Sequence, residues 1–110
     1  MSLAEIKEHG TQKADFYPTG ISNIVRCADG FKMSVVAGPG AYCSPRPKPI
    51  VGLTGNYTAA EVGFPSERPE PWDIWREFAE NADDPTATVY GWVPFEVIEA
   101  LAALHGGERL

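Results

Sequence analysis

Residues 87–107, ATVYGWVPFEVIEALAALHGG, read as a strand that runs directly into a helix. β-Branched and aromatic side chains, which are enriched in strands, dominate the first part: Thr88, Val89, Tyr90, Trp92 and Val93. Pro94 cannot continue a strand ladder, but it fits the first turn of a helix, where its missing N–H is not needed. An apolar stripe at helical spacing follows: Val97, Ile98, Leu101 and Leu104. We expect Ile98 and Leu101 to pack against a sheet, and the helix to end before Gly106.

Alternating segments predict the rest of that sheet. Residues 21–27 and 31–37 alternate apolar with polar side chains on either side of an Ala-Asp-Gly turn, which predicts an antiparallel hairpin. Residues 41–43 are interpreted as a continuation of the second strand, and residues 57–64 as a third strand. The sequence therefore predicts an α+β fold, with an antiparallel sheet of about four strands and two helices packed on one face.

Turn-forming and polar segments separate these elements. Residues 44–56 are expected to form a loop rich in proline and glycine, because proline cannot donate to a ladder. The other helix is expected over residues 71–78, with Pro71 at its start. Residues 1–15 carry only a weak helical pattern that Gly10 ends, so they are either a tail or a short helix.

The length and composition describe one globular domain. The chain has 110 residues, of which 44% are hydrophobic and 22% are charged, values typical of folded rather than disordered proteins. No apolar run approaches the roughly 20 residues of a membrane span, and the first residues lack the apolar stretch of a signal peptide. We therefore expect residues 1–110 to be a single cytoplasmic domain, with Cys27 and Cys43 as reduced thiols.

The charge is unevenly distributed along the chain. Residues 1–60 hold four acids and six bases, whereas residues 61–110 hold eleven acids and three bases, a net charge of −8. This acidic half would repel a nucleic-acid backbone, so no direct nucleic-acid binding is expected. It would attract a protein partner with a basic patch, and the candidate residues for that contact are Glu67, Glu70, Asp73, Glu77 and Glu80. The alternative interpretation is that these acids form only a solvated face.

Aromatic side chains of the last strand form a second candidate surface. Strict alternation places Tyr90 and Trp92 on one face of that strand, and Val89 and Val93 on the other. Tyr42 is a candidate for the same patch. Trp and Tyr are enriched among the residues that dominate interfaces, so an exposed patch would be a binding surface. A second layer covering the rings would instead make them part of the core, and both interpretations stay open.

Few side chains are candidates for catalysis or metal binding. A metal site would need a cluster of His, Cys or carboxylate ligands. The two histidines are far apart in the sequence, and the two cysteines lack a Cys-x-x-Cys spacing, so no metal or cofactor is expected. Cys43 could act as a nucleophile, with Arg46 favouring its thiolate form and with Glu61 or His105 as a partner. A lone cysteine in a strand is also typical of a small buried hydrophobe, and a histidine suits the C-terminus of a helix.

Three segments together resemble a known group of proteins. They are YCSPR at residues 42–46, YTAAEVGFPS at 57–66, and VYGWVP at 89–94 running on to HGG at 105–107. Through these segments the chain resembles small acidic proteins encoded in phages and prophages. The resemblance extends over residues 27–107. That group has no established activity, so the resemblance carries over no functional residues. It implies a host-cytoplasm setting and a host or phage protein as partner. By analogy, small acidic phage proteins often inhibit host defence, including anti-CRISPR and anti-restriction proteins.

The sequence therefore predicts a non-enzymatic binding protein of phage or prophage origin. It would act on a host or phage protein through an acidic, aromatic-bearing surface. The first alternative is a small enzyme that uses Cys43 as its nucleophile. The second alternative is a virion or structural accessory protein that associates with itself, for example as a homodimer.

Overall fold

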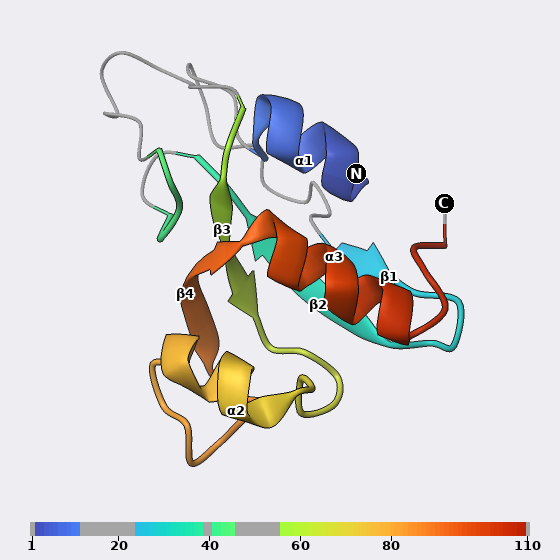
Figure 1. The fold of residues 1–110 in the computed structure, drawn as a ribbon, viewed down its shortest axis with the longest axis vertical. Coiled ribbons are helices and arrows are strands. Elements are labelled where there is room, and N and C mark those ends of the chain that lie inside the picture. Colours follow the sequence, from blue (N-terminus) through green and yellow to red (C-terminus); the bar gives the residue numbers. More distant parts are fainter. Residues whose placement is uncertain (1, 12–23, 39–40, 46–55, 110) are drawn as a thin grey trace.

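The fold is built on one antiparallel sheet (Figure 1). The computed structural model describes residues 2–11, 24–38, 41–45 and 56–109. Among these residues four strands pair in sequence order: β1 (Ile24–Arg26), β2 (Lys32–Val36), β3 (Ala59–Gly63) and β4 (Val89–Pro94). The helical elements are α1 (Leu3–His9), α2 (Trp72–Trp75), the 3₁₀ helix η1 (Arg76–Phe78) and α3 (Phe95–Leu104). The predicted α+β class with a four-stranded antiparallel sheet is confirmed.

Two helices packed on one face of the sheet are not confirmed. α3 lies across the sheet, and Ile98 and Leu101 are buried in the core, as predicted. The helix expected over residues 71–78 is split into α2 and η1, and it leads into Ala79, which forms an antiparallel bridge with Tyr90 of β4. This segment therefore continues the ladder at the edge of the sheet. In the part of the chain that the structure describes, no helix has the length and apolar character needed to cross a membrane.

Short helix α1 forms within the N-terminal segment that the sequence left open. Ser2 accepts a hydrogen bond from the Glu5 N–H at 3.2 Å, while Glu5 Oε1 accepts one from the Ser2 N–H at 3.2 Å. This reciprocal capping satisfies two of the backbone donors that a helix start leaves without partners. Leu3 and Ile6 are then buried in the core. The rest of that segment, together with most of the predicted proline-rich loop, lies outside the described residues.

Predicted and observed strands differ mainly at their ends. The expected continuation at residues 41–43 is not a strand, and Ser44 instead forms an isolated bridge with Ala59. β1 is observed from Ile24, and residues 21–23 of its predicted span are outside the described part.

The hydrophobic core contains side chains from the sheet and from the α-helices α1, α2 and α3: Val25, Met33, Val35, Val62, Tyr90, Val93, Leu3, Ile6, Trp75, Ile98 and Leu101. Burying a side chain of this kind stabilises by about 1.5–3 kcal/mol, so this core dominates the stability of the fold.

An extra residue in β4 breaks the alternation that the sequence suggests. Ala60 pairs with Val93 and Val62 pairs with Tyr90, so two steps along β3 correspond to three along β4. Gly91 and Trp92 together therefore face one residue of β3, which is the arrangement of a β-bulge. As a result Tyr90 and Val93 are both fully buried, whereas Trp92 has 50% of its surface exposed. The expectation that Tyr90 and Trp92 share a face was wrong, because strict alternation assumes a regular ladder.

Both edges of the sheet are covered by short backbone pairs. On the open side of β1, Cys27 forms an antiparallel bridge with Glu108, so the chain end lies along the first strand. On the open side of β4, Ala79 bridges Tyr90 in the same way. Exposed strand edges offer unpaired N–H and C=O groups to other chains. These two bridges therefore shorten the stretches on which unspecific strand pairing could start.

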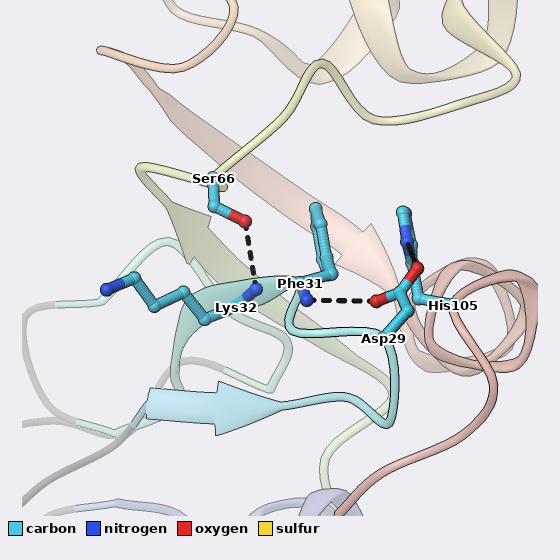
Figure 2. A network of polar contacts seen from close by, with 5 residues as sticks. All are labelled: Asp29, Phe31, Lys32, Ser66 and His105. Atoms are coloured by element: carbon cyan, nitrogen blue, oxygen red, sulfur yellow. Dashed lines mark hydrogen bonds and ion pairs between the residues drawn. The ribbon is translucent and has the colours of Figure 1, made fainter.

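A polar and aromatic network ties the end of α3 to the β1–β2 turn (Figure 2). His105 Nδ1 lies 2.7 Å from Asp29 Oδ2, and the His105 ring stacks on Phe31 with centroids 4.0 Å apart and an angle of 8° between the planes. Asp29 Oδ1 accepts a hydrogen bond from the Phe31 N–H at 2.9 Å. Next along the chain, the Lys32 N–H donates to Ser66 Oγ at 3.0 Å. Two hydrogen bonds hold the pKa of the Asp29 carboxyl below its usual value. The bond from the Phe31 N–H has the larger effect, and the bond with His105 the next largest.

Two leucines on α3 test whether the helix is docked as described. Leu101 is 1% exposed and Leu104 is 61% exposed. Leu101→Ala should lower the free energy of unfolding by about 2–5 kcal/mol, because it removes buried methyl groups and leaves a cavity. Leu104→Ala, the matched control, should change it by less than about 0.5 kcal/mol. Urea titrations of both variants measure this difference, and a loss below about 1 kcal/mol for Leu101→Ala would show that the helix is not packed on the sheet.

The Asp29 network predicts a loss of stability in acid. The pKa of Asp29 is lower in the folded chain than its ordinary value of 3.8. The ionised carboxylate therefore contributes its full stabilisation above that value, and loses it as the pH falls through the folded-state pKa. Asp29→Asn removes this contribution. The difference in urea midpoint between the natural chain and Asp29→Asn should shrink between about pH 5 and about pH 2. A difference that stays constant over this range would contradict the role of Asp29.

Candidate protein-binding surface

Two aromatic rings stack on the surface beside the bulge. The rings of Tyr42 and Trp92 have centroids 4.9 Å apart and an angle of 26° between their planes. Their backbones are also joined, since the Trp92 N–H donates to the Tyr42 carbonyl at 2.9 Å. The Tyr42 N–H in turn donates to Glu61 Oε1 at 3.1 Å. Tyr42 is 36% exposed and Trp92 is 50% exposed, so the pair, called the aromatic pair below, presents a large apolar surface to solvent.

Gly91 and an unusual backbone at Trp92 make this stacking possible. A Cβ atom on residue 91 would lie 3.2 Å from Tyr42 Cβ and 3.5 Å from Tyr42 Cδ2, so any larger residue would press on the ring. Trp92 has a φ of 53°, in the left-handed region that bulky residues rarely adopt. Such a backbone costs about 1–3 kcal/mol, and residues of this kind cluster at functional sites. The fold thus accepts local strain to hold Trp92 at the surface.

An open groove of about 520 Å³ lies beside the aromatic pair. It is lined by Tyr42, Glu77, Phe78, Glu80, Val89, Gly91 and Trp92. The Glu80 N–H donates to the Val89 carbonyl at 2.9 Å, which holds the acidic segment against β4. Glu77 and Glu80 are both exposed, and neither carboxylate has an ion pair or hydrogen bond with a described residue. We call this feature the aromatic–acidic groove.

Tyr90, a predicted partner-binding residue, does not reach the surface. Its side chain is fully buried, and its hydroxyl donates to the Pro85 carbonyl at 2.6 Å. Its ring packs edge-on against Trp75, with centroids 5.5 Å apart. Burial raises the pKa of Tyr90 to about 12. Because the bulge turns this ring inward, Tyr90 belongs to the core and not to a binding surface.

The five predicted acids differ in their relation to the groove. Only Glu77 and Glu80 line the aromatic–acidic groove. Glu67 and Asp73 are exposed and are not among the residues of its wall. Glu70 is engaged within the chain: its Oε2 atom lies 2.8 Å from Nε of Arg68, and its Oε1 atom accepts a hydrogen bond from the Trp72 N–H at 3.1 Å.

Cys43 has surroundings that suit a buried side chain rather than a nucleophile. It is 1% exposed, and its Sγ atom lies 3.4 Å from the Pro45 carbonyl and 3.6 Å from the Gly38 carbonyl. Arg46, its predicted activator, lies outside the described residues. Glu61 instead accepts the hydrogen bond from the Tyr42 N–H.

His105 is held in the network of the β1–β2 turn. Its Nδ1 atom pairs with Asp29, and one face of its ring is covered by Phe31.

The Cys27 thiol is also unsuited to react as a nucleophile. Burial, followed by the charges of Asp29 and Glu108, raises the pKa of the Cys27 thiol, which disfavours the reactive thiolate. Neither cysteine is in a disulfide. Among the described residues no group of three or more His, Cys, Asp or Glu side chains could hold a metal ion.

Three residues that line the groove were not predicted as site residues from the sequence: Phe78, Val89 and Gly91. Gly91 was the available signal, because an isolated glycine inside a strand pattern indicates a bulge or a close backbone approach. Strict alternation places Val89 on the face opposite Trp92, so it gives no sign that both line the same groove. Phe78 is the last residue of the helix expected over residues 71–78, and its place in the groove depends on where η1 meets β4.

A substitution at Gly91 tests the aromatic pair. Gly91→Ala places a methyl group 3.2 Å from Tyr42 Cβ, so it should displace the ring and lower stability by about 1–3 kcal/mol. Gly63→Ala is the matched control, since its Cβ would make only ordinary contacts, the nearest at 3.6 Å to Val89. Near-ultraviolet circular dichroism, which reports aromatic packing, should change for Gly91→Ala and much less for Gly63→Ala. An unchanged spectrum for Gly91→Ala would mean that Tyr42 and Trp92 are not stacked.

Comparison with known proteins gives no family for this chain. No family model, curated protein or solved structure matches it. What the aromatic–acidic groove can bind is therefore inferred from its own side chains.

Proposed function

We propose that this chain is a non-enzymatic binding protein that engages a basic patch of a protein partner through the aromatic–acidic groove. One observation supports this most: Trp92 stands half exposed on a left-handed backbone, stacked on Tyr42. Glu77 and Glu80 line the same groove. Backbone strain of this kind clusters at functional sites, so its presence beside an exposed ring and two acids favours a role in recognition.

The acids and the aromatic pair would contribute in different ways. Glu77 and Glu80 would attract a basic partner over a distance of about one Debye length, roughly 8 Å at physiological salt, and so speed its approach. Trp92 and Tyr42 would supply short-range affinity, since Trp and Tyr are enriched among residues whose truncation costs about 2 kcal/mol or more. The groove would thus combine fast association with slow dissociation.

The class of partner follows from the resemblance to small acidic phage and prophage proteins. On that resemblance we propose a host or phage protein as the partner, met in the host cytoplasm. The proposed outcome of binding is inhibition of a host defence system of the CRISPR or restriction type. The acidic character of the chain supports this by analogy only, because many such inhibitors are small and acidic.

Capture of the partner and measurement of its kinetics test the proposal. Tagged chain would first be used to isolate a partner from a bacterial lysate. Trp92→Ala should then mainly speed dissociation, with a loss of about 2 kcal/mol or more in binding free energy. Glu77→Lys combined with Glu80→Lys should mainly slow association and flatten its salt dependence. Circular dichroism would confirm that each variant is folded.

Acids outside the groove provide the matched control for charge. Glu67→Lys combined with Asp73→Lys changes the net charge by the same amount, but neither residue lines the groove. This control should slow association less than the groove variant. Equal effects of the two double variants, together with normal dissociation from Trp92→Ala, would contradict the proposal. A mass that rises with concentration in sedimentation, and falls in Trp92→Ala, would instead assign the groove to self-association.

A further inference from the structure

A carboxylate and an indole ring on the surface of this chain together bind the guanidinium group of Arg68. Arg68 Nε and one terminal nitrogen each lie 2.8 Å from Glu70 Oε2. The guanidinium carbon of Arg68 lies 5.5 Å from the centroid of the Trp72 ring. One carboxylate and one indole face thus hold the same cation, which combines charge-assisted hydrogen bonds with a cation–π contact.

The aromatic–acidic groove presents the same two kinds of group, and no described base lines it. Trp92 is half exposed, and Glu77 and Glu80 line the groove with it. Its described lining residues include no lysine or arginine. The groove is therefore lined by an indole ring, which Tyr42 stacks on, and by two carboxylates that no described base of the chain engages.

We infer that this groove accepts an arginine side chain of the partner, with the guanidinium on the Trp92 ring and paired with Glu77 or Glu80. This inference rests on the proposed function, because it names the part of the basic patch that enters the groove. Arginine fits better than lysine, since a planar guanidinium can stack on an indole and pair with a carboxylate at the same time. It is also more weakly hydrated than an ammonium group, so it leaves water more readily.

Two peptides that differ in charge but hardly in shape test the inference. They are acetyl-Gly-Arg-Gly-amide and the same peptide with citrulline, whose side chain is neutral. In ¹⁵N–¹H spectra of the full chain, the arginine peptide should shift the Trp92 indole and the Gly91 amide signals. The Trp72 indole, which Arg68 already covers, should move much less. The citrulline peptide should bind about five- to tenfold more weakly, and a lysine peptide about threefold more weakly.

Neutral variants of the acids locate the binding site. Glu77→Gln combined with Glu80→Gln should weaken binding of the arginine peptide about tenfold, because the charge-assisted hydrogen bonds are lost. Glu67→Gln combined with Asp73→Asn removes the same net charge outside the groove, and should leave the affinity within about twofold. Trp92→Leu keeps an apolar side chain without a π-face, so it should weaken binding of the arginine peptide more than that of the citrulline peptide.

The outcomes separate this inference from the proposed function. Equal affinity for the arginine and citrulline peptides would overturn the inference, as would the absence of saturable shifts at about 10 mM peptide. The proposed function would survive either result if a captured partner still dissociates faster from Trp92→Ala. Both would fail if partner binding were also insensitive to Trp92→Ala.

Discussion

The bulge in β4 is the constraint on which the rest of the structure depends. Gly91 and Trp92 share one position opposite β3, so the strand gains one residue between two paired positions. Tyr90 and Val93 then both point into the core, which a regular ladder would not allow. The residue that the extra step turns outward is Trp92. The same local event therefore completes the core and creates the exposed half of the aromatic–acidic groove.

The core and the chain ends are joined through α3. The helix follows β4 without a loop, so the position of the strand sets where the helix begins. At its far end, His105 stacks on Phe31 and pairs with Asp29 of the β1–β2 turn (Figure 2). The start of α3 is thus fixed by β4 at one edge of the sheet, and its end is fixed by the β1–β2 hairpin at the other edge. Residues after it continue to the open side of β1, where Glu108 bridges Cys27.

The acidic half of the chain is divided by its internal contacts. Glu70 is occupied by Arg68 beside Trp72, whereas Glu77 and Glu80 line the groove without a described partner. A count of charges makes these acids equivalent, but their surroundings differ. An acid already paired with a base adds little to the attraction of a partner, because its field is largely cancelled at a distance. The proposed binding surface is therefore narrower than the acidic composition suggests.

The sequence alone determined the elements whose signal is local. Alternation predicted β2, and the step from a β-branched run to Pro94 and an apolar stripe predicted β4, α3 and the burial of Ile98 and Leu101. The Ser2 and Glu5 spacing also carries the capping-box signal for the start of α1. Composition identified the acidic half of the chain and the aromatic residues from which the candidate surface is drawn.

Only the tertiary structure decided which of these residues meet. A bulge depends on how many residues the partner strand supplies, and a single strand does not contain that count. Strict alternation therefore placed Tyr90 on the same face as Trp92, whereas the bulge buries Tyr90 and leaves Trp92 exposed. The groove joins Tyr42, η1 and β4 through pairings between segments that are distant in sequence. Local preferences act within a few residues, so the meeting of these segments follows from the packing of the whole sheet.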